Sequence, residues 1–372
     1  MGNYNTPNNA HGVAVSGNLA LVADEASGLQ IIDISMPASP TLVGTYDTPS
    51  YALSVAVSGN LALVADGDSG LLLIDIATPA DPTLVGTYNT PGWAYGVAVS
   101  GNLALVADGS SGLQIINITT PTSPRWVGTY NTPSAASGVA VSGNLALVAD
   151  GSSGLQIINI TTPASPSWDG TYNTPDWAYN VAVSGNLALV ADRASGLQII
   201  NITTPASPTR VGTYNTPGAA RGVAVSGNLA LVADEDSGLQ IIDIATPASP
   251  TMGGIYNTPS SAYGVAVSGN LALVADINSG LQIISLMQYC FTSELVPLLG
   301  ALPIKVIADD HQGGQVVDSF LLKSNQYPYA NIPIQDKSIR PETAFQMNIK
   351  SDLAFVDADG DTLSLAVRQT DG

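Results

Sequence analysis

The sequence has 372 residues and a net charge of −19, with 45% apolar but only 10% charged residues. The acid excess is strong in residues 1–286, which contain eighteen Asp or Glu and four Arg but no Lys, a net charge of −14. Phosphates and anionic lipid headgroups are held by clustered Lys and Arg, so this composition argues against nucleic acid and a membrane surface as partners. No apolar run is long enough to span a membrane, and the single cysteine, Cys290, excludes an internal disulfide.

A repeat of 42 residues organises most of the chain. The segment Val-Ala-Val-Ser-Gly-Asn begins at Val13, Val55, Val97, Val139, Val181, Val223 and Val265. This period is typical of a propeller blade. In the third unit we predict strand A at 96–100, strand B at 103–108, strand C at 113–119 and strand D at 125–132. Strands B and C are apolar on both sides, so both faces of each sheet must be covered, as happens when blades stack around an axis.

A tyrosine of strand D predicts how the ring closes. It recurs every 42 residues from Tyr46 to Tyr256, and one step before Tyr46 lies Tyr4. The seventh unit ends after its strand C, at Leu286, and has no strand D of its own. We therefore predict an all-β, seven-bladed propeller over residues 1–286, in which the N-terminal strand completes the last blade and removes two open edges. The alternative is that the chain starts one strand early by chance.

The repeated segments resemble a known family. Leu-Ala-Leu-Val-Ala-Asp, Gly-Leu-Gln-Ile-Ile-Asp-Ile and Thr-Pro-Ala-Ser-Pro, taken over residues 2–286, are similar to the LVIVD-repeat propellers. The resemblance implies a bacterial or archaeal protein that is exported or attached to the cell surface and has no defined activity. It transfers no catalytic motif. We expect an extracellular or cell-surface location in a prokaryote, although the chain opens without a signal peptide.

Differences between the units are concentrated in the loop from strand D to the next strand A and in the turn between strands B and C. Because strands alternate in direction, both segments lie at the same end of the blades, around the mouth of the central channel. The predicted ligand-binding face comprises His11, Tyr51, Trp93, Tyr95, Trp177, Tyr179, Arg221 and Tyr263. Aromatic rings among polar groups suit a protein or carbohydrate partner. The alternative is that these residues drift neutrally or fill gaps between blades.

At two positions of the repeat, which we call columns, a polar residue recurs from unit to unit, and we interpret both as structural. The residue that ends strand B is aspartate in every unit: Asp24, Asp66, Asp108, Asp150, Asp192, Asp234 and Asp276. We expect its side chain to accept backbone N–H bonds two residues further on, and a sevenfold ring that holds a cation is the alternative. A second column is expected to brace the loop between strands C and D: Asp33, Asp75, Asn117, Asn159, Asn201 and Asp243.

Signals for catalysis are few. The chain has two histidines, His11 and His311, and no Ser/His/Asp grouping, metal-spaced cluster or phosphate loop. A carboxylate-based hydrolase or lyase at the channel mouth is an alternative, but no matched pair of acids stands out among the similar units. The sequence therefore predicts a non-enzymatic interaction or scaffold module with no certain cofactor.

The remaining residues have a different composition. We predict a linker at 287–299 and, at 300–372, strands that resemble a cadherin-like sandwich of the dystroglycan or putative Ig type, with the closing strands before the opening ones. The segment is then either permuted or cut from a longer array. A third interpretation is an incomplete sandwich that accepts a strand from another copy, which would make the protein a self-associating structural subunit of an extracellular assembly. Asp357, Asp359 and Asp361 suit a Ca²⁺ site, and an acid-rich turn is the alternative.

Overall fold

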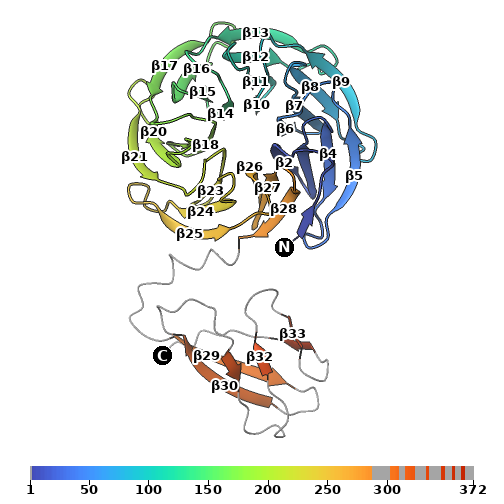
Figure 1. The fold of residues 1–372 in the computed structure, drawn as a ribbon, viewed down its shortest axis with the longest axis vertical. Helices are drawn as coiled ribbons and strands as arrows, with labels where there is room; N and C mark the ends of the chain where they lie inside the picture. Colours follow the sequence, from blue (N-terminus) through green and yellow to red (C-terminus); the bar gives the residue numbers. More distant parts are fainter. Residues whose placement is uncertain are drawn as a thin grey trace. The chain divides into compact units, whose positions relative to one another are not determined.

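The computed structural model describes residues 2–286 and, beyond them, only the backbone of six strands between residues 302 and 364. The chain divides into two compact units, Met1–Tyr289 and Cys290–Gly372. Unit 1 is a ring of seven four-stranded sheets (Figure 1). In the described part of the chain, no helix is both long and apolar enough to cross a bilayer.

In blades 1 to 6 the four strands follow one another in chain order, with strand A innermost and strand D outermost (Figure 1). Blade 1 contains β2 (Gly12–Ser16), β3 (Leu19–Ala23), β4 (Leu29–Asp33) and β5 (Thr41–Tyr46), and blade 2 contains β6 (Ser54–Ser58), β7 (Leu61–Ala65), β8 (Leu71–Asp75) and β9 (Thr83–Tyr88). Blade 3 contains β10 (Gly96–Ser100), β11 (Leu103–Ala107), β12 (Leu113–Asn117) and β13 (Arg125–Tyr130), and blade 4 contains β14 (Gly138–Ser142), β15 (Leu145–Ala149), β16 (Leu155–Asn159) and β17 (Ser167–Tyr172). Blade 5 contains β18 (Asn180–Ser184), β19 (Leu187–Ala191), β20 (Leu197–Asn201) and β21 (Thr209–Tyr214), and blade 6 contains β22 (Gly222–Ser226), β23 (Leu229–Ala233), β24 (Leu239–Asp243) and β25 (Thr251–Tyr256).

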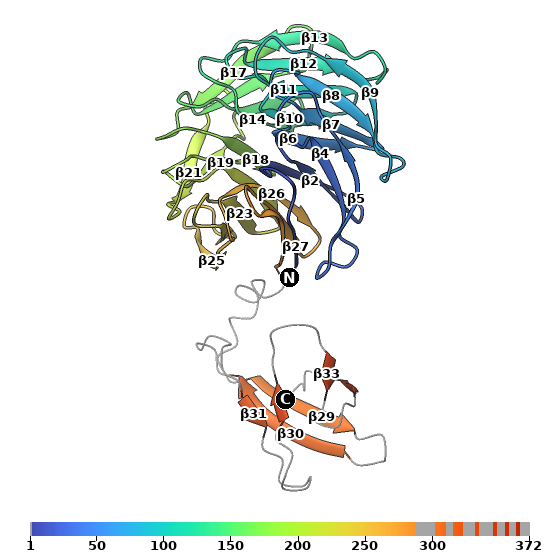
Figure 2. The same ribbon diagram turned by 45° about the vertical axis from the view of Figure 1, so that its right-hand side comes forward.

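Blade 7 combines the two ends of the repeat region. It contains β26 (Ala262–Ser268), β27 (Leu271–Asp276), β28 (Gly280–Ser285) and, as its outer strand, the N-terminal β1 (Gly2–Tyr4). Strand β1 runs antiparallel to β28, so that Gly2 faces Ile283 and Tyr4 faces Leu281. Figure 1 shows the N-terminus beside β28, and Figure 2 shows it at the same blade in an oblique view of the ring. The predicted closure by the N-terminal strand is confirmed.

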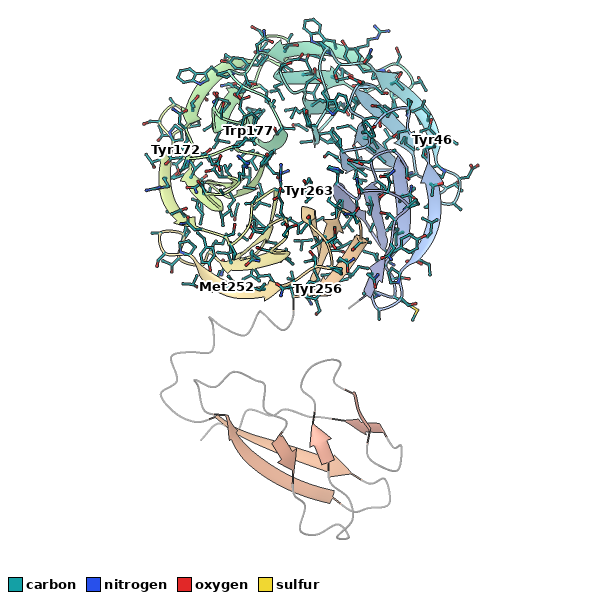
Figure 3. The ribbon with its side chains drawn as sticks, in the orientation of Figure 1. Tyr46, Tyr172, Trp177, Met252, Tyr256 and Tyr263 are labelled. Atoms are coloured by element: carbon teal, nitrogen blue, oxygen red, sulfur yellow. The ribbon has the colours of Figure 1, made fainter. Side chains whose placement is uncertain are left out.

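The core lies between neighbouring blades, as the two-sided apolar pattern of strands B and C predicts. One cluster joins Leu21 and Ile31 of blade 1 to Val64 and Ile74 of blade 2, all fully buried. The tyrosines of strand D cover such clusters from outside, and Figure 3 shows Tyr46, Tyr172 and Tyr256 toward the periphery of the ring. Burying apolar surface on both faces of every sheet is the main source of stability for this fold.

The loops between strands C and D fix the spacing of the blades at one end. The predicted brace is confirmed, because the side-chain oxygen of Asn117 accepts the N–H of Thr119 at 2.8 Å and the other members of its column do the same in their own blades. A glycine of strand D lets the next loop approach. A Cβ added to Gly128 would lie 2.2 Å from the carbonyl oxygen of Pro163 in the next blade, so no larger residue fits there.

The predicted strand bounds of blade 3 are correct at the start and too long at the end of strands B, C and D, by one or two residues. Strand D also contains a feature that the pattern did not predict. Its pairing with strand C shifts register between Ile115 and Ile116, which face Gly128 and Trp126. The residue between these two partners is therefore bulged out of the ladder, and a bulge redirects neighbouring side chains. The strands β5, β9, β17, β21 and β25 shift in the same way.

In unit 2 the backbone of six strands is described: β29 (Leu302–Asp309), β30 (Gln315–Leu322), β31 (Ile332–Ile334), β32 (Phe345–Met347), β33 (Ala354–Val356) and β34 (Thr362–Ser364). They pair antiparallel as β29 with β30, β31 with β32, and β33 with β34. The cadherin-like sandwich stays a prediction. The predicted linker at 287–299 and the predicted calcium ligands Asp357, Asp359 and Asp361 lie outside the described residues.

Candidate functional site

The variable loops are built onto a uniform frame of backbone contacts. The turn between strands B and C of each blade forms a two-residue bridge with the loop that leads into the next blade, as between Gly109 and Ala136. The bridge from Ile277 to Ala10 closes the ring. The alanine of this bridge is the same in all units and is fully buried in each: Ala10, Ala52, Ala94, Ala136, Ala178, Ala220 and Ala262. The loops and turns therefore lie together on one face, as predicted.

The aspartate at the end of strand B ties the loop that enters its own blade. Asp108 accepts a hydrogen bond from the Thr90 hydroxyl at 2.5 Å and another from the Gly92 N–H at 2.8 Å. The predicted bond to a backbone N–H two residues on is wrong for this carboxylate, because the incoming loop lies closer to strand B than the following turn does. Burial raises the pKa of Asp108, and these hydrogen bonds oppose the rise.

The carboxylates of the aspartate column do not converge on one point. The carboxylates of Asp24, Asp108 and Asp234 each bind the loop of their own blade rather than a shared point. Within the part of the chain that the structure describes, no three His, Cys, Asp or Glu side chains lie close enough together to hold a metal ion.

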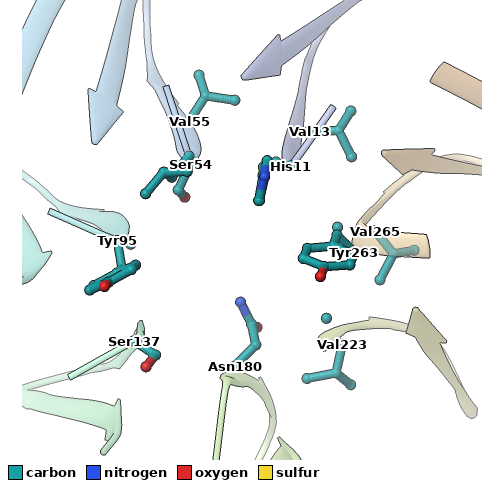
Figure 4. Close-up of a pocket in the computed structure, with 15 residues that line it drawn as sticks. His11, Val13, Ser54, Val55, Tyr95, Ser137, Asn180, Val223, Tyr263 and Val265 are labelled. Atoms are coloured by element: carbon teal, nitrogen blue, oxygen red, sulfur yellow. The ribbon is translucent and has the colours of Figure 1, made fainter. Parts of the chain in front are cut away.

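A cavity of about 130 Å³ lies at the channel mouth, where the strands A begin. Every blade contributes at least one residue to its lining, and no Asp or Glu is among them. Three predicted residues, His11, Tyr95 and Tyr263, line this cavity, and Figure 4 shows their rings around the open centre with Asn180 and Ser137 completing the ring. The first residue of strand A and the residue before it thus define the mouth.

One half of the mouth is a continuous arc of cationic and aromatic groups. The Arg221 guanidinium lies 4.0 Å from the ring centroid of Tyr179 and 5.0 Å from that of Tyr263. The ring of His11 meets Tyr263 edge to face, with the ring centroids 5.1 Å apart. We call these four residues, which come from blades 5, 6, 7 and 1, the arginine arc. Cation–π contacts of this kind hold the guanidinium in place against the rings.

Two carboxylates hold the arginine arc. Glu235 forms an ion pair with Arg221, and Glu25 accepts a hydrogen bond from the His11 ring at 2.8 Å between Nε2 and Oε1. Burial lowers the pKa of His11, while the neighbouring Glu25 acts to raise it. The charges of Arg221 and Glu235 thus compensate each other at the mouth, although the propeller as a whole is strongly acidic.

These glutamates occupy a strained position of the turn. In blades 1 to 6 the first residue of the turn between strands B and C has a positive φ, which is 53° at Gly109. Non-glycine residues with positive φ are Glu25, Arg193 and Glu235, at 41°, 42° and 45°. A side chain in this region costs about 1 kcal/mol. All three have an ionic or hydrogen-bonding partner at the mouth, and that of Arg193 is Asp176, 3.9 Å away.

The other half of the mouth is aromatic. Trp93 lies between Tyr51 and Tyr95, with ring centroids 6.1 and 6.4 Å away, and Trp177 lies 6.4 Å from Tyr179. The two tyrosines Tyr51 and Tyr95 are 47% and 43% exposed. The tryptophans fill space as well, because a Cβ on Gly151 would lie 2.8 Å from the ring of Trp177. The aromatic half thus combines exposed rings with rings that pack over a glycine turn.

The structure therefore brings all eight predicted residues to one face and joins them in two groups. Sequence reasoning missed Glu25 and Glu235. A signal was present, since a glutamate at this turn position occurs only in the two units whose mouth residue, fourteen positions earlier, is His11 or Arg221. It also missed Ser54, Ser137 and Asn180, which line the cavity beside or in place of aromatic rings.

Three comparisons with known proteins bear on this architecture. The LVIVD repeat matches residues 7–48, 49–90, 91–132, 133–174, 177–216, 217–258 and 259–285. A search of the curated proteins gave no significant match. Among solved structures, the chain is similar to the computationally designed Ika8 protein, with a TM-score of 0.58, 11% identity, and coverage of 76% of this chain and 97% of that one. It is also similar to a chain of the mitotic checkpoint complex, with a TM-score of 0.64, 16% identity, and coverage of 76% and 92%. At these identities the structural likeness concerns the fold alone.

Proposed function

This chain belongs to the LVIVD repeat family, and on that premise we propose that its propeller is a non-enzymatic interaction module that binds a protein or a glycan at the channel mouth. One observation carries the proposal. The blades share nearly identical frames, yet the residues that face the axis at the mouth differ and are held by specific partners, as Arg221 is by Glu235 and two tyrosine rings.

The chemistry of the mouth supports binding rather than catalysis. The cavity lining offers hydroxyl, amide, imidazole and phenol groups, and no carboxylate is among the lining residues that the structure describes. The nearby carboxylates of Glu25 and Glu235 are engaged with His11 and Arg221. A hydrolase of the two-carboxylate type needs one acid that can give a proton and one that stays free. Convergent polar groups beside exposed aromatic rings are what a binding site for an oriented ligand uses.

The location of such a module is part of the proposal. The family resemblance supports an extracellular or cell-surface protein, and the low Lys content with a net charge of −14 in residues 1–286 suits a soluble surface that repels nucleic acid and anionic lipid. No cofactor is required for binding of this kind. Calcium binding and self-association through the C-terminal segment remain predictions from the sequence.

A pair of substitutions copied from another blade tests the proposal. Blade 2 carries Leu53 and Gly67 where blade 6 carries Arg221 and Glu235, so the double variant Arg221→Leu/Glu235→Gly places a naturally tolerated pair in the same frame. Wild type and variant are compared on printed glycan and protein arrays, and the strongest ligands are then titrated. We expect the variant to lose about tenfold or more in affinity with an unchanged circular dichroism spectrum.

The matched control is Arg210→Leu, which removes an arginine from the outer strand β21 and copies Leu42 and Leu84 of the same column. It should leave binding at the mouth unchanged. The proposed function would be contradicted if wild type and the double variant bound every array ligand equally, or if neither array gave a ligand.

A further inference from the structure

A second surface of the propeller has features that packing does not account for. In blades 1 to 6 the second residue of strand D is exposed, and the bulge that follows it redirects the chain. This column reads Leu42, Leu84, Trp126, Trp168, Arg210 and Met252. Trp126 and Trp168, in neighbouring blades 3 and 4, are 53% and 55% exposed. We call this pair the rim tryptophans.

Each rim tryptophan is held by the same three-residue relay. The Trp126 indole N–H donates to the Thr129 hydroxyl at 2.9 Å, and this hydroxyl donates to Oε1 of Gln114 at 2.6 Å. Gln114 is itself buried and donates to the backbone oxygen of Ser111 at 2.7 Å. Blade 4 repeats the relay through Trp168, Thr171 and Gln156, at 2.9 and 2.7 Å. An exposed ring is thereby tied to the buried part of the sheet.

The relay exists because of the tryptophan. Blades 1 and 5 have the same threonine and glutamine but Leu42 or Arg210 in place of the ring, and in them Oε1 of Gln30 and of Gln198 is buried without a hydrogen-bond partner. In blades 3 and 4 the indole N–H donates to the threonine hydroxyl oxygen, and the proton of that hydroxyl is donated to the glutamine. The two indoles are therefore fixed in orientation before any ligand arrives.

The relay determines which part of each rim tryptophan is available to a ligand. The indole N–H is already satisfied within the protein, so the exposed part of each ring offers its flat apolar face and no free donor. Fixing a ring in advance lowers the entropy lost on binding. The two rings lie in adjacent blades, so their directions differ by about one seventh of a turn, and an extended ligand can meet both.

We infer that the rim tryptophans form a second binding site, for neutral oligosaccharides, distinct from the channel mouth. A pyranose ring presents a face of C–H groups that stacks on an aromatic face whose quadrupole is negative. The negative charge of the propeller, −14 over residues 1–286, disfavours acidic polysaccharides at the same surface. A protein partner would need a larger contiguous apolar area, whereas polar residues such as Arg125, Ser167 and Thr129 surround these rings.

The column itself supplies safe substitutions for the test. Trp126→Leu and Trp168→Leu copy the residue of blades 1 and 2, and the double variant removes both rings without altering the frame. Arg210→Trp does the opposite in blade 5, next to blade 4, where Thr213 and Gln198 are in place to rebuild the relay. Full-length proteins are titrated with cellohexaose, maltohexaose and chitohexaose, and with a galacturonic acid hexamer as the acidic comparator, by calorimetry and by tryptophan fluorescence.

We expect at least one neutral hexasaccharide to bind with a dissociation constant below about 10 mM. Each single variant should weaken this binding about tenfold or less, the double variant should abolish it, and Arg210→Trp should strengthen it. The mouth variant Arg221→Leu/Glu235→Gly should leave it unchanged, which separates this site from the proposed function. The inference is overturned if no neutral hexasaccharide binds, if the acidic hexamer binds better, or if the double variant binds as wild type does.

Discussion

Neighbouring blades make different contacts at the two ends of the ring, the end with the C–D loops and the end with the channel mouth. At the end with the C–D loops, a strand D glycine lies directly against the next blade, since a Cβ on Gly128 would lie 2.2 Å from the oxygen of Pro163. At the mouth end, the contact is a backbone bridge through a buried alanine such as Ala136, and the next side chain points toward the axis. The first arrangement requires glycine at the point of contact, whereas the second leaves the residue after the alanine free to vary in each blade. Variation at the mouth is therefore a consequence of the frame.

Replacing the glycine of strand D by a larger residue should disrupt the contact at the C–D end and cause the largest loss of stability. In Gly128→Val the new side chain would overlap backbone of the next blade, which neither partner can move without distorting its sheet. We expect the free energy of unfolding to fall by about 3 kcal/mol or more, measured by urea denaturation. Gly143→Asn is the control, because Gly143 has φ +57° with no neighbouring atom within 4 Å of an added Cβ and Asn tolerates this conformation. Equal losses in both variants would contradict the close approach.

Removing one aspartate side chain at the mouth end should lower the free energy of unfolding less than Gly128→Val does. Asp108→Ala leaves the Thr90 hydroxyl and the Gly92 N–H without their acceptor, and a buried polar group left unpaired costs about 1–3 kcal/mol. We expect a loss of about 2 kcal/mol in the free energy of unfolding and faster amide hydrogen exchange in the loop before β10. If amide exchange became faster in the C–D loop of the same blade instead, Asp108 would not be what stabilises the loop before β10.

Removing a tryptophan at the mouth separates packing from binding. Trp177→Ala copies Ala135 and Ala219 of the same column and uncovers the turn at Gly151, so we expect a loss of about 1 kcal/mol, read from the thermal midpoint. Tyr51→Ala removes an exposed ring of the same face and should cost less stability than Trp177→Ala. If both variants lose equal stability, Trp177 has no special role in covering the turn.

Mild acid should stabilise the propeller. Burial raises the pKa of the aspartates that end strand B, as at Asp108 and Asp234. A carboxyl with a higher pKa in the folded state binds its proton more tightly there than in the unfolded chain, so its contribution to stability grows as the pH falls and is lost as the pH rises through the folded value. The lowered pKa of His11 acts in the opposite direction. We expect the thermal midpoint to rise between pH 7 and pH 5, and a smaller rise in Asp108→Asn. A steady fall over this range would contradict the direction of the aspartate shifts.

Much of the ring follows from the sequence because near-identical units make position visible. The 42-residue step predicts the blades, the place of Tyr4 predicts the closure, and alternation of strand direction places the variable loops on one face. The partner of Asp108 could not be predicted, because it depends on how the incoming loop passes strand B in space. The outward orientation of the Trp126 side chain depends on a bulge that no residue type in strand D predicts.

The site was predicted as a set of residues rather than as contacts. The eight mouth residues were found from their departures from the repeat, but the ion pair between Arg221 and Glu235 joins two variable columns that were considered separately. Comparing departures between columns, unit by unit, recovers this pair and that of His11 with Glu25. The same comparison would not recover Trp126 with Thr129, since the threonine is shared by blades that lack the ring.

Closure of the ring by β1 has a consequence for synthesis. Gly2 pairs with Ile283, so β1 is synthesised long before its partner strand β28. At about 5–20 residues per second this interval is roughly 15–60 s. Blades 1 to 6 can form their own sheets as they emerge, but blade 7 and the seam are completed only after translation has passed β28. Until then the blades form an open arc, and β1 has no partner strand.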